Sequence, residues 1–490
     1  MEKRIYILLF VILFFVISCK KGFEEINENP NVSLEANPEE LFAYAQLKYH
    51  TDYGHGVNTE MWGLNKWMQI QANINGISSL GEEYFIGSDA LNNTWQITYA
   101  NVLGNISEAI RITNDQPEKI NENSIYRIYR AYVFHRLTDL WGDIPYSEAH
   151  NLVNDENIPD FTPAYDSQES IYIDLLNELE EAKNLFDPSL PSLGMQDWLY
   201  QGNVDHWKRF ANSIRMRMAT RISNISPGLS SEVIQDIIDE NMFIQSNEEG
   251  AHFPHTSVSA MRSAFYELHS TGQGMRNPSQ YLIEKLNSDN DPRIGNYATF
   301  TPESIIFGTF EYVGMPSFIP NAQVDAIEYS NLTISYIGDY FLDASLEGTS
   351  LGYPEVCFLL AEASLNGVGT PLSPSEYYNN GVSAHMEFMN VNQSEIDEYL
   401  QNEGAFDGTL ENIINEKWKT LIYTDGIEIF NEWRRTGFPI LKDPDGLEIN
   451  ISSIPKRLAY PALEWSLNGQ NVMDVGLVQN DFLTPVWWAE

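Results

Sequence analysis

The chain has 490 residues and a formal net charge of −41 at neutral pH, which argues against nucleic acid or an anionic membrane surface as a partner. Apolar residues make up 43% and aromatic residues 12%, a composition typical of a folded chain. Cys19 and Cys357 are the only cysteines. With Cys19 modified as described below, no internal disulfide can form.

Residues 1–18 are predicted to be a lipoprotein signal peptide that is removed. Lys3 and Arg4 precede an unbroken apolar run from Ile5 to Ile17, which has the length of a secretory signal and is too short to span a bilayer. The run ends in Val-Ile-Ser-Cys, which resembles the bacterial lipobox, so we expect Cys19 to carry lipid. The alternative is an ordinary signal peptide that happens to contain a cysteine.

Residues 19–38 are predicted to be a lipidated flexible tether, because they are rich in Asn, Glu and Pro and poor in large apolar residues. Residues 39–490 follow without a Gly/Ser-rich or Pro-rich linker. We therefore expect them to form one large folded unit, held by its core, in which Cys357 is a buried apolar residue.

The periodicity of residues 39–490 is mostly helical. Apolar residues recur at spacings of three and four in paired stretches, namely 91–112 with 124–142, 168–186 with 204–223, 353–367 with 373–389, and the two halves of 403–435. Four such pairs predict a mainly α fold, a tetratricopeptide-like helical repeat scaffold.

Long irregular segments separate the pairs, notably 51–90, 186–202, 246–278 and 297–350. Segments of this length on a helical frame are usually functional. Within the last of them, residues 309–318 and 332–341 are expected to supply a few short strands.

Several polar and charged residues are expected to stabilise the fold and to take no part in catalysis or ligand binding. Arg434 and Arg435 are predicted to satisfy buried acceptors between helices, and Arg457, Tyr460 and Glu464 are interpreted in the same way. Asp291 and Arg293 are predicted to stabilise a turn through their opposite charges.

Glu355 and Glu362 are seven residues apart, so they share one side of a helix. A carboxylate pair of this kind is also the signature of glycoside hydrolysis, but the surrounding apolar pattern favours packing. No nucleotide fingerprint, metal motif or catalytic motif is present, and Pro254 disfavours a metal pair of His252 and His255. We therefore predict no cofactor, no metal and no enzymatic activity.

The candidate ligand-binding residues lie in two stretches that mix aromatic and polar side chains. Sugar recognition needs an aromatic platform beside groups that hydrogen-bond hydroxyls. In residues 62–85 the candidates are Trp67, Asn73, Asn75 and Tyr84, and in residues 259–280 they are Arg262 and Tyr266. The alternative for the first stretch is that Trp62 and Trp67 are buried in the helix bundle.

Five motifs together resemble one family. They are LWGDIPYSEA at 140–149, DPR at 291–293, PEVCFLLAEA at 354–363, NEWRRTGFP at 431–439 and IPKRLAYPALE at 454–464. Their order and spacing, with the lipobox and the tether, resemble the SusD/RagB-like outer-membrane lipoproteins of the Bacteroidetes.

The resemblance implies a lipid-anchored nutrient-binding protein on the outer face of the outer membrane. It would capture a glycan and deliver it to a TonB-dependent, SusC-like β-barrel transporter, over which it acts as a hinged lid. The alternative within the same architecture is a protein that carries peptides or another nutrient. The rivals of another class are a lipid-anchored glycoside hydrolase and a structural repeat adaptor that binds a protein.

Overall fold

Paired helices dominate the described part of the chain, which comprises residues 36–51, 59–73, 84, 86–150, 161–270, 276–318, 329–442 and 453–490 of this computed structural model. The first half contains α3 (Pro38–Thr51), α5 (Ser88–Gln96), η4 (Ile97–Leu103), α6 (Gly104–Thr113), α7 (Ile120–Trp141), α8 (Gln168–Asn184), α9 (Val204–Arg221) and α10 (Pro227–Glu240). The second half contains α16 (Tyr353–Leu365), α17 (Pro374–Phe388), α18 (Gln393–Gln401), α19 (Leu410–Leu421) and α20 (Gly426–Thr436).

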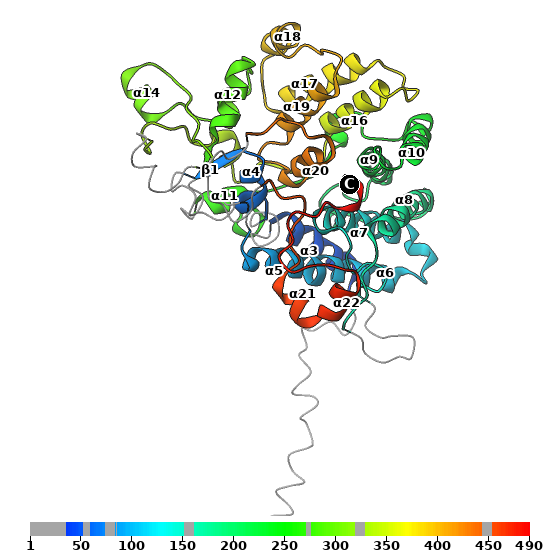
Figure 1. Cartoon of the computed structure of the whole chain (residues 1–490). Coiled ribbons are helices and arrows are strands. Elements are labelled where there is room, and N and C mark those ends of the chain that lie inside the picture. The colour runs from blue at the N-terminus through cyan, green and yellow to red at the C-terminus, as the bar shows by residue number, and fades with distance from the viewer. Residues whose placement is uncertain are drawn as a thin grey trace, which may run out of the picture.

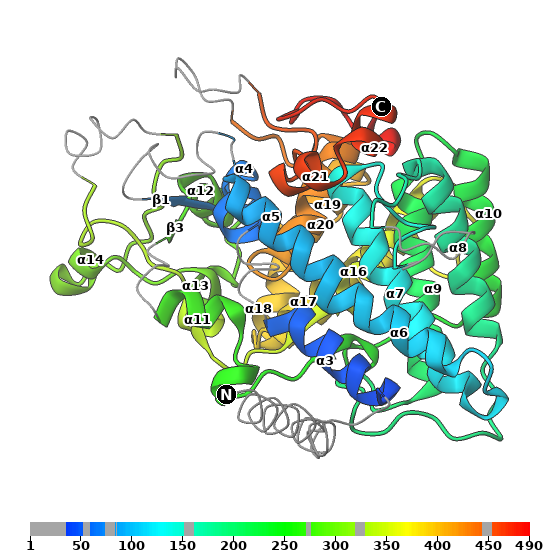
Figure 2. The same ribbon diagram turned by 90° about the horizontal axis from the view of Figure 1, so that it is seen from below.

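The four predicted helix pairs are all present. Helix α6 packs on α7, α8 on α9, α16 on α17, and α19 on α20. Two further packings, α3 on α6 and α9 on α10, were not predicted. Figures 1 and 2 show these helices stacked along one side of the molecule, which confirms the predicted mainly α repeat scaffold.

Helix α7 is the central element of the scaffold. Nearly all of its side chains are buried, because α6, α8, α9 and α20 pack around it. It ends where the sequence predicts, at Gly142, whose φ of 85° suits glycine. The helix therefore carries its polar residues, including Arg136, into the interior of the molecule.

Shorter elements gather on the opposite side (Figure 1). They are η2 (Glu60–Leu64), α4 (Asn65–Trp67), α11 (Ala264–Ser270), α12 (Gln280–Ser288), α13 (Ile294–Tyr297) and α14 (Pro302–Phe307). Two more helices, α21 (Ala462–Leu467) and α22 (Gly469–Asp474), lie near the C-terminus. The segments predicted to be irregular thus contain short helices.

Two small antiparallel sheets complete the described fold. Strand β1 (Gln71–Asn73) pairs with β3 (Arg276–Pro278), and β2 (Ala251–Phe253) pairs with β4 (Gly348–Leu351). The prediction of a few short strands is confirmed, but the positions 309–318 and 332–341 were wrong. In these two stretches Met315 and Ile337 each form an isolated bridge. The backbone pairing covers a single residue at each position, so no strand develops.

One hydrophobic cluster runs through the helical body, from Phe42 near the start of α3 to Trp488 near the C-terminus. Cys357 is buried as predicted, and burial raises the pKa of its thiol to about 12, so it is an unreactive core residue. Among the described residues, no helix has the length and apolarity needed to cross a membrane.

Buried ion pairs tie the helices together. Arg217 of α9 meets Glu355 of α16 at 2.6 Å. Arg435 of α20 meets Glu362 of α16, also at 2.6 Å, and Arg293 meets Asp291 at the same distance. These contacts confirm the structural interpretation of the paired arginines, of the two glutamates and of the Asp-Pro-Arg turn.

Candidate functional site

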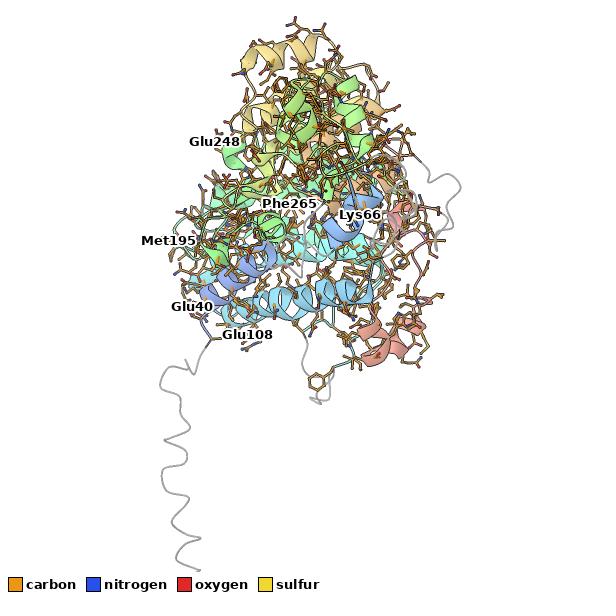
Figure 3. All side chains as sticks on the ribbon, turned by 90° about the vertical axis from the view of Figure 1, so that its left-hand side faces the viewer. Glu40, Lys66, Glu108, Met195, Glu248 and Phe265 are labelled. Atoms are coloured by element: carbon orange, nitrogen blue, oxygen red, sulfur yellow. The ribbon has the colours of Figure 1, made fainter. Side chains whose placement is uncertain are left out.

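The two stretches predicted to bind ligand lie side by side. Strands β1 and β3 come from these stretches and pair in register, with Asn73 opposite Arg276 and Gln71 opposite Pro278. Figure 3 views this side of the molecule, with Lys66 of α4 and Phe265 of α11 near its middle. The sequence alone gave no reason for the two stretches to meet, and their pairing makes this side the candidate binding face.

A cleft of about 150 Å³ opens between these stretches and the helical body. Its lining combines rings with polar groups: Tyr49, Tyr132, Phe265, Phe341 and Tyr423 beside His50, Glu60, Asn65, Arg136, His255, Ser263, Thr424 and Asp425, with Ala264 and residues 346–350. The lining comes from α3, η2, α4, α7, α11, β4 and the start of α20. An aromatic and polar mixture of this kind is the chemistry that sugar recognition needs.

A guanidinium and two carboxylates form one wall of the cleft. Arg136 donates from Nη1 and Nη2 to the two oxygens of Asp425, at 2.7 and 2.8 Å, and its Nη2 lies 3.9 Å from Glu60. Asp425 also caps α20 by accepting from the backbone N–H of Glu428. Glu60 accepts from the backbone N–H of Gly426 at 2.9 Å. These contacts fix η2 against the start of α20.

The surroundings of Glu60 change its titration. Burial, followed by the charge of Asp425, raises the pKa of Glu60 to about 7. Arg136 and the Gly426 N–H oppose that rise without cancelling it. Arg136 itself has a raised pKa because the surrounding carboxylate and tyrosines outweigh its burial, so it stays cationic.

Three buried polar atoms on the cleft lining lack a hydrogen-bond partner in the described structure. They are Asn65 Oδ1, Arg136 Nε and Tyr423 Oη. Their residues are 2%, 7% and 8% exposed. Buried polar atoms are nearly always paired in proteins, and the residues that carry these three line the cleft.

Aromatic rings form another part of the lining. Phe265 of α11 is half-buried, and its ring centroid lies 5.4 Å from that of Tyr423. Tyr423 in turn packs edge-on against Phe341 at 5.2 Å. This row places a partly exposed ring beside the unpartnered Tyr423 hydroxyl. A sugar stacks on such a ring and hydrogen-bonds beside it.

A second, smaller hollow of about 60 Å³ lies behind residues 346–350. It shares Phe341, Thr349, Ser350 and Asp425 with the cleft. The two hollows therefore adjoin each other at strand β4.

Two of the predicted ligand residues lie in the core instead. Trp67 is fully buried and packs edge-on against Phe430 and Phe482. Tyr84 is also fully buried, with its ring against Phe318. Neither presents a face to solvent, so burial of Trp67 in the helix bundle, the alternative stated above, describes it correctly.

Of the other predicted residues, two adjoin residues that line the cleft. Asn73 is half-buried in β1, and Asn75 lies outside the described residues. Arg262 and Tyr266 flank the cleft-lining residues 263–265, with the guanidinium of Arg262 5.6 Å from the centre of the Tyr266 ring. Arg262 is held there by Glu267 at 2.9 Å.

The residues that line the cleft were mostly missed by sequence reasoning. Asn65 lies within the predicted stretch 62–85 and Glu60 just before it, but Arg136, Tyr423 and Asp425 lie in predicted scaffold helices or the turn between them. Arg136 interrupts the apolar face of α7, and an ionisable residue at a core position was the one available signal. It did not reveal which distant elements would meet there.

No metal site is found among the described residues, where no group of three His, Cys, Asp or Glu side chains could hold an ion. His252 and His255, for which the sequence disfavours a metal pair, each contact other polar groups. His252 contacts Thr349 and the Asn247 carbonyl, and His255 contacts the Leu346 carbonyl at 2.6 Å.

Comparison with known proteins gives a consistent result. Residues 30–461 match a family model described as SusD-like, starch-binding and associating with the outer membrane. A search of curated proteins found no match.

Solved structures match over nearly the whole chain. One, named as a chitin-binding protein, is 27% identical, with a TM-score of 0.81 over 93% of this chain and 100% of that one. A SusD-like protein of the Bacteroidetes is 22% identical, with a TM-score of 0.80 and the same coverage. A chitin-binding SusD homologue of Flavobacterium johnsoniae is 21% identical, with a TM-score of 0.77 over 92% and 98%.

Proposed function

Since the chain belongs to the SusD-like family of binding proteins that associate with the outer membrane, we propose that it is a cell-surface lipoprotein that captures an oligosaccharide. The ligand enters the cleft lined by α3, η2, α4, α7, α11, β4 and the start of α20. The observation that carries this proposal is the mixture of aromatic rings and polar side chains that lines a cleft large enough for one sugar ring.

The recognition chemistry follows from the lining. A sugar ring stacks on Phe265, and its hydroxyls form hydrogen bonds with the polar side chains that line the cleft. A hydrogen bond to an already buried group gains affinity without a new desolvation cost on the protein side. The Arg136–Asp425 pair is held within the protein and orients the wall rather than reacting.

Chitin-derived oligosaccharides are the first ligands to test, because two of the similar structures carry chitin-binding names at 27% and 21% identity. The family description names starch instead, so starch oligosaccharides are the natural comparison. Peptides form the third class, which the sequence leaves open.

The anchor and the partner complete the proposal. Lipid on Cys19 holds the protein to the outer membrane, residues 19–38 act as a tether, and residues 39–490 form the binding unit. The captured sugar passes to a TonB-dependent, SusC-like β-barrel when the protein closes over it as a lid. The strongly acidic chain suits a neutral or cationic cargo.

A glycoside hydrolase is the second candidate, because Glu60 has the raised pKa of a general acid and sits beside another carboxylate. The contacts argue against it. Both oxygens of Asp425 are occupied by Arg136, and one also caps α20, so neither is available as a nucleophile or base. Release of reducing ends from any bound glycan would favour the hydrolase.

The experiment is calorimetric titration of the full chain in detergent with chitin tetramer, maltotetraose and an unrelated peptide. We expect one oligosaccharide to bind and its affinity to fall at least about tenfold in Phe265→Ala, which removes the stacking ring. Phe310→Ala is the matched control, since Phe310 is an exposed ring outside the cleft. Equal loss in both variants, or binding of the peptide alone, would contradict the proposal.

A further inference from the structure

A lobe at the edge of the molecule presents large apolar side chains to solvent. Helix α14 carries Ile305, Ile306 and Phe307, which are 53%, 72% and 73% exposed. Leu332 is 57% exposed and lies beside the helix, because its carbonyl accepts from the backbone N–H of Glu303 at 2.9 Å. We call these four apolar residues the α14 patch. In Figures 1 and 2 α14 lies at the outer edge of the side that is built of shorter elements.

Helix α14 is oriented in the opposite way to a helix that packs on a core. Ser304 is its one buried residue, while the large apolar side chains of Ile305, Ile306 and Phe307 are exposed. A surface helix of a folded protein normally buries its apolar face and exposes its polar one. Folding therefore does not account for the apolar residues at these positions. A cluster of exposed apolar side chains is typical of an interaction surface.

Local hydrogen bonds hold the α14 patch in place. Thr301 caps the start of the helix, since its hydroxyl accepts from the Ser304 N–H at 3.1 Å. Gly308, with a φ of 76°, ends the helix. The backbone N–H of Thr301 also donates to the Glu311 carbonyl at 2.9 Å, which closes the segment into a loop. The patch is thus presented on an ordered backbone, which lowers the entropic cost of docking.

The charges around the α14 patch indicate which kind of surface covers it. Glu303 and Glu311 are exposed on the same lobe, and residues 294–416 contain no Lys or Arg. On the neighbouring helix α12, Lys285 is paired with Asp289 at 3.3 Å. Peripheral binding to a membrane with anionic headgroups draws on Lys and Arg, which this lobe lacks. A protein surface with an apolar groove and a basic rim complements the lobe in both respects.

The α14 patch shares its side of the molecule with elements that line the cleft. Helices η2, α4 and α11 contribute to the cleft lining and lie, like α14, on the side of shorter elements (Figures 1 and 2). A protein that passes a sugar from this cleft to a transporter must turn these elements toward it, and α14 turns with them.

We propose that the α14 patch is the docking surface for the transporter, whose matching surface is an apolar groove rimmed by Lys or Arg side chains. This inference rests on the proposed function and adds to it the surface through which the partner is bound. The apolar side chains enter the groove, where they are removed from water. Glu303 and Glu311 meet the basic rim, which orients the two proteins.

The test is recovery of the transporter with the full chain, purified in detergent from the outer membrane of its native cells. With the native chain we expect a β-barrel that mass spectrometry identifies as a TonB-dependent transporter. Ile306→Asp places a charge in the apolar contact, so recovery of the barrel should fall at least about tenfold. Ile173→Asp is the matched control, because Ile173 is an exposed isoleucine on α8, among the paired helices, and it should leave recovery unchanged.

The basic rim has a test of its own. Glu303→Lys combined with Glu311→Lys should also reduce recovery of the barrel at least about tenfold, because like charges then meet across the contact. Glu169→Lys combined with Glu232→Lys is the control, since both glutamates are exposed on the paired helices α8 and α10. Equal losses in the two double variants would overturn the docking surface, because a change of net charge alone would then account for them.

The outcomes separate this inference from the function on which it rests. Equal recovery of the barrel with the native chain and with Ile306→Asp overturns the docking surface and leaves the proposed function standing. A native preparation without a barrel overturns the transporter part of the proposed function and this inference with it. An unchanged melting temperature shows that Ile306→Asp is folded, and Phe307→Asp is the second variant, with the same expected loss.

A lipid surface is the other partner that an apolar patch can bind, and it has a separate arm. Cys19→Ser, which lacks the proposed anchor, is mixed with protein-free vesicles of phosphatidylethanolamine and phosphatidylglycerol. We expect it to stay in solution after sedimentation of the vesicles. Binding to the vesicles that is lost when Ile306→Asp is added would assign the α14 patch to the membrane and overturn the protein partner.

Discussion

At the scale of single residues, the cleft contains a carboxyl group with a raised pKa and polar atoms without a hydrogen-bond partner in the described structure. Glu60 has a pKa of about 7, and the Tyr423 hydroxyl and Asn65 Oδ1 have no partner. None of these properties is visible in the sequence, because each depends on which distant residues lie nearby. Arg262 and Tyr266, which the sequence predicts to bind ligand, flank residues 263–265 of the cleft lining, and their role in binding stays a prediction.

The raised pKa of Glu60 is expected to make the free energy of unfolding depend on pH. Its folded pKa of about 7 lies above the ordinary 4.5, so its contribution is fully present below pH 4.5 and is lost as the pH rises through 7. Glu60→Gln cannot ionise. We expect it to raise the free energy of unfolding by about 1–3 kcal/mol at pH 8 and to change little at pH 4.5.

Thermal melts of both proteins at the two pH values measure this effect. Glu303→Gln, at an exposed position, is the control and should show no pH-dependent difference. A gain for Glu60→Gln that is equal at both pH values would contradict the raised pKa.

The Tyr423 hydroxyl is expected to contribute to ligand affinity and not to the free energy of unfolding. Tyr423→Phe removes a hydroxyl that has no protein partner, so stability should stay within about 0.5 kcal/mol while oligosaccharide affinity falls. Tyr378→Phe is the matched control, because its hydroxyl donates to the Gly404 carbonyl and lies outside the cleft; it should lose about 1 kcal/mol of stability and no affinity. The opposite pattern in urea denaturation and calorimetry would refute the assignment.

At the scale of elements, the sequence predicted the four helix pairs because each helix carries a clear apolar face. It missed the true strands because β1 to β4 are three or four residues long, too short to show an alternating pattern. It also missed the packing of α10 on α9. The pairing of β1 with β3 joins segments about 200 residues apart in the sequence and has no local signal.

The buried ion pairs between elements predict large stability effects. Arg435→Met leaves Glu362 without its cation and removes one of the cations that pair with Glu432, and removing one partner of a buried pair costs about 3–5 kcal/mol. Urea denaturation at pH 7 measures this loss. Arg111→Met is the control, since Arg111 pairs with Glu108 on the surface and should leave stability unchanged. Equal effects of the two variants would refute the structural role of Arg435.

At the scale of the whole molecule, a side built of long paired helices packs against a side of shorter elements (Figures 1 and 2), and residues from both sides line the cleft. Helical periodicity predicted this division, because apolar spacings of three and four mark the paired helices and are missing from the long segments between them. The cleft's depth and charge were beyond prediction, since α3, α7, α11 and α20 meet there only in three dimensions.

The proposed anchor predicts a change of location. In Cys19→Ser the thiol that would be acylated is gone, so we expect the protein to leave the outer-membrane fraction while the folded body is unchanged. Fractionation of cells with detection of the chain in each fraction measures this, and Cys357→Ser, at a buried core position, is the control for loss of a thiol. Retention of Cys19→Ser in the membrane would contradict lipidation at that residue.

A crystal structure of the full chain with the tightest-binding oligosaccharide tests the central claim most directly. The account predicts a sugar ring stacked on Phe265, with its polar groups within hydrogen-bond distance of Glu60, Asn65 and Tyr423. A sugar bound elsewhere would contradict it, for example in the separate hollow of about 230 Å³ beside Tyr99 and Phe161, with the cleft filled only by water.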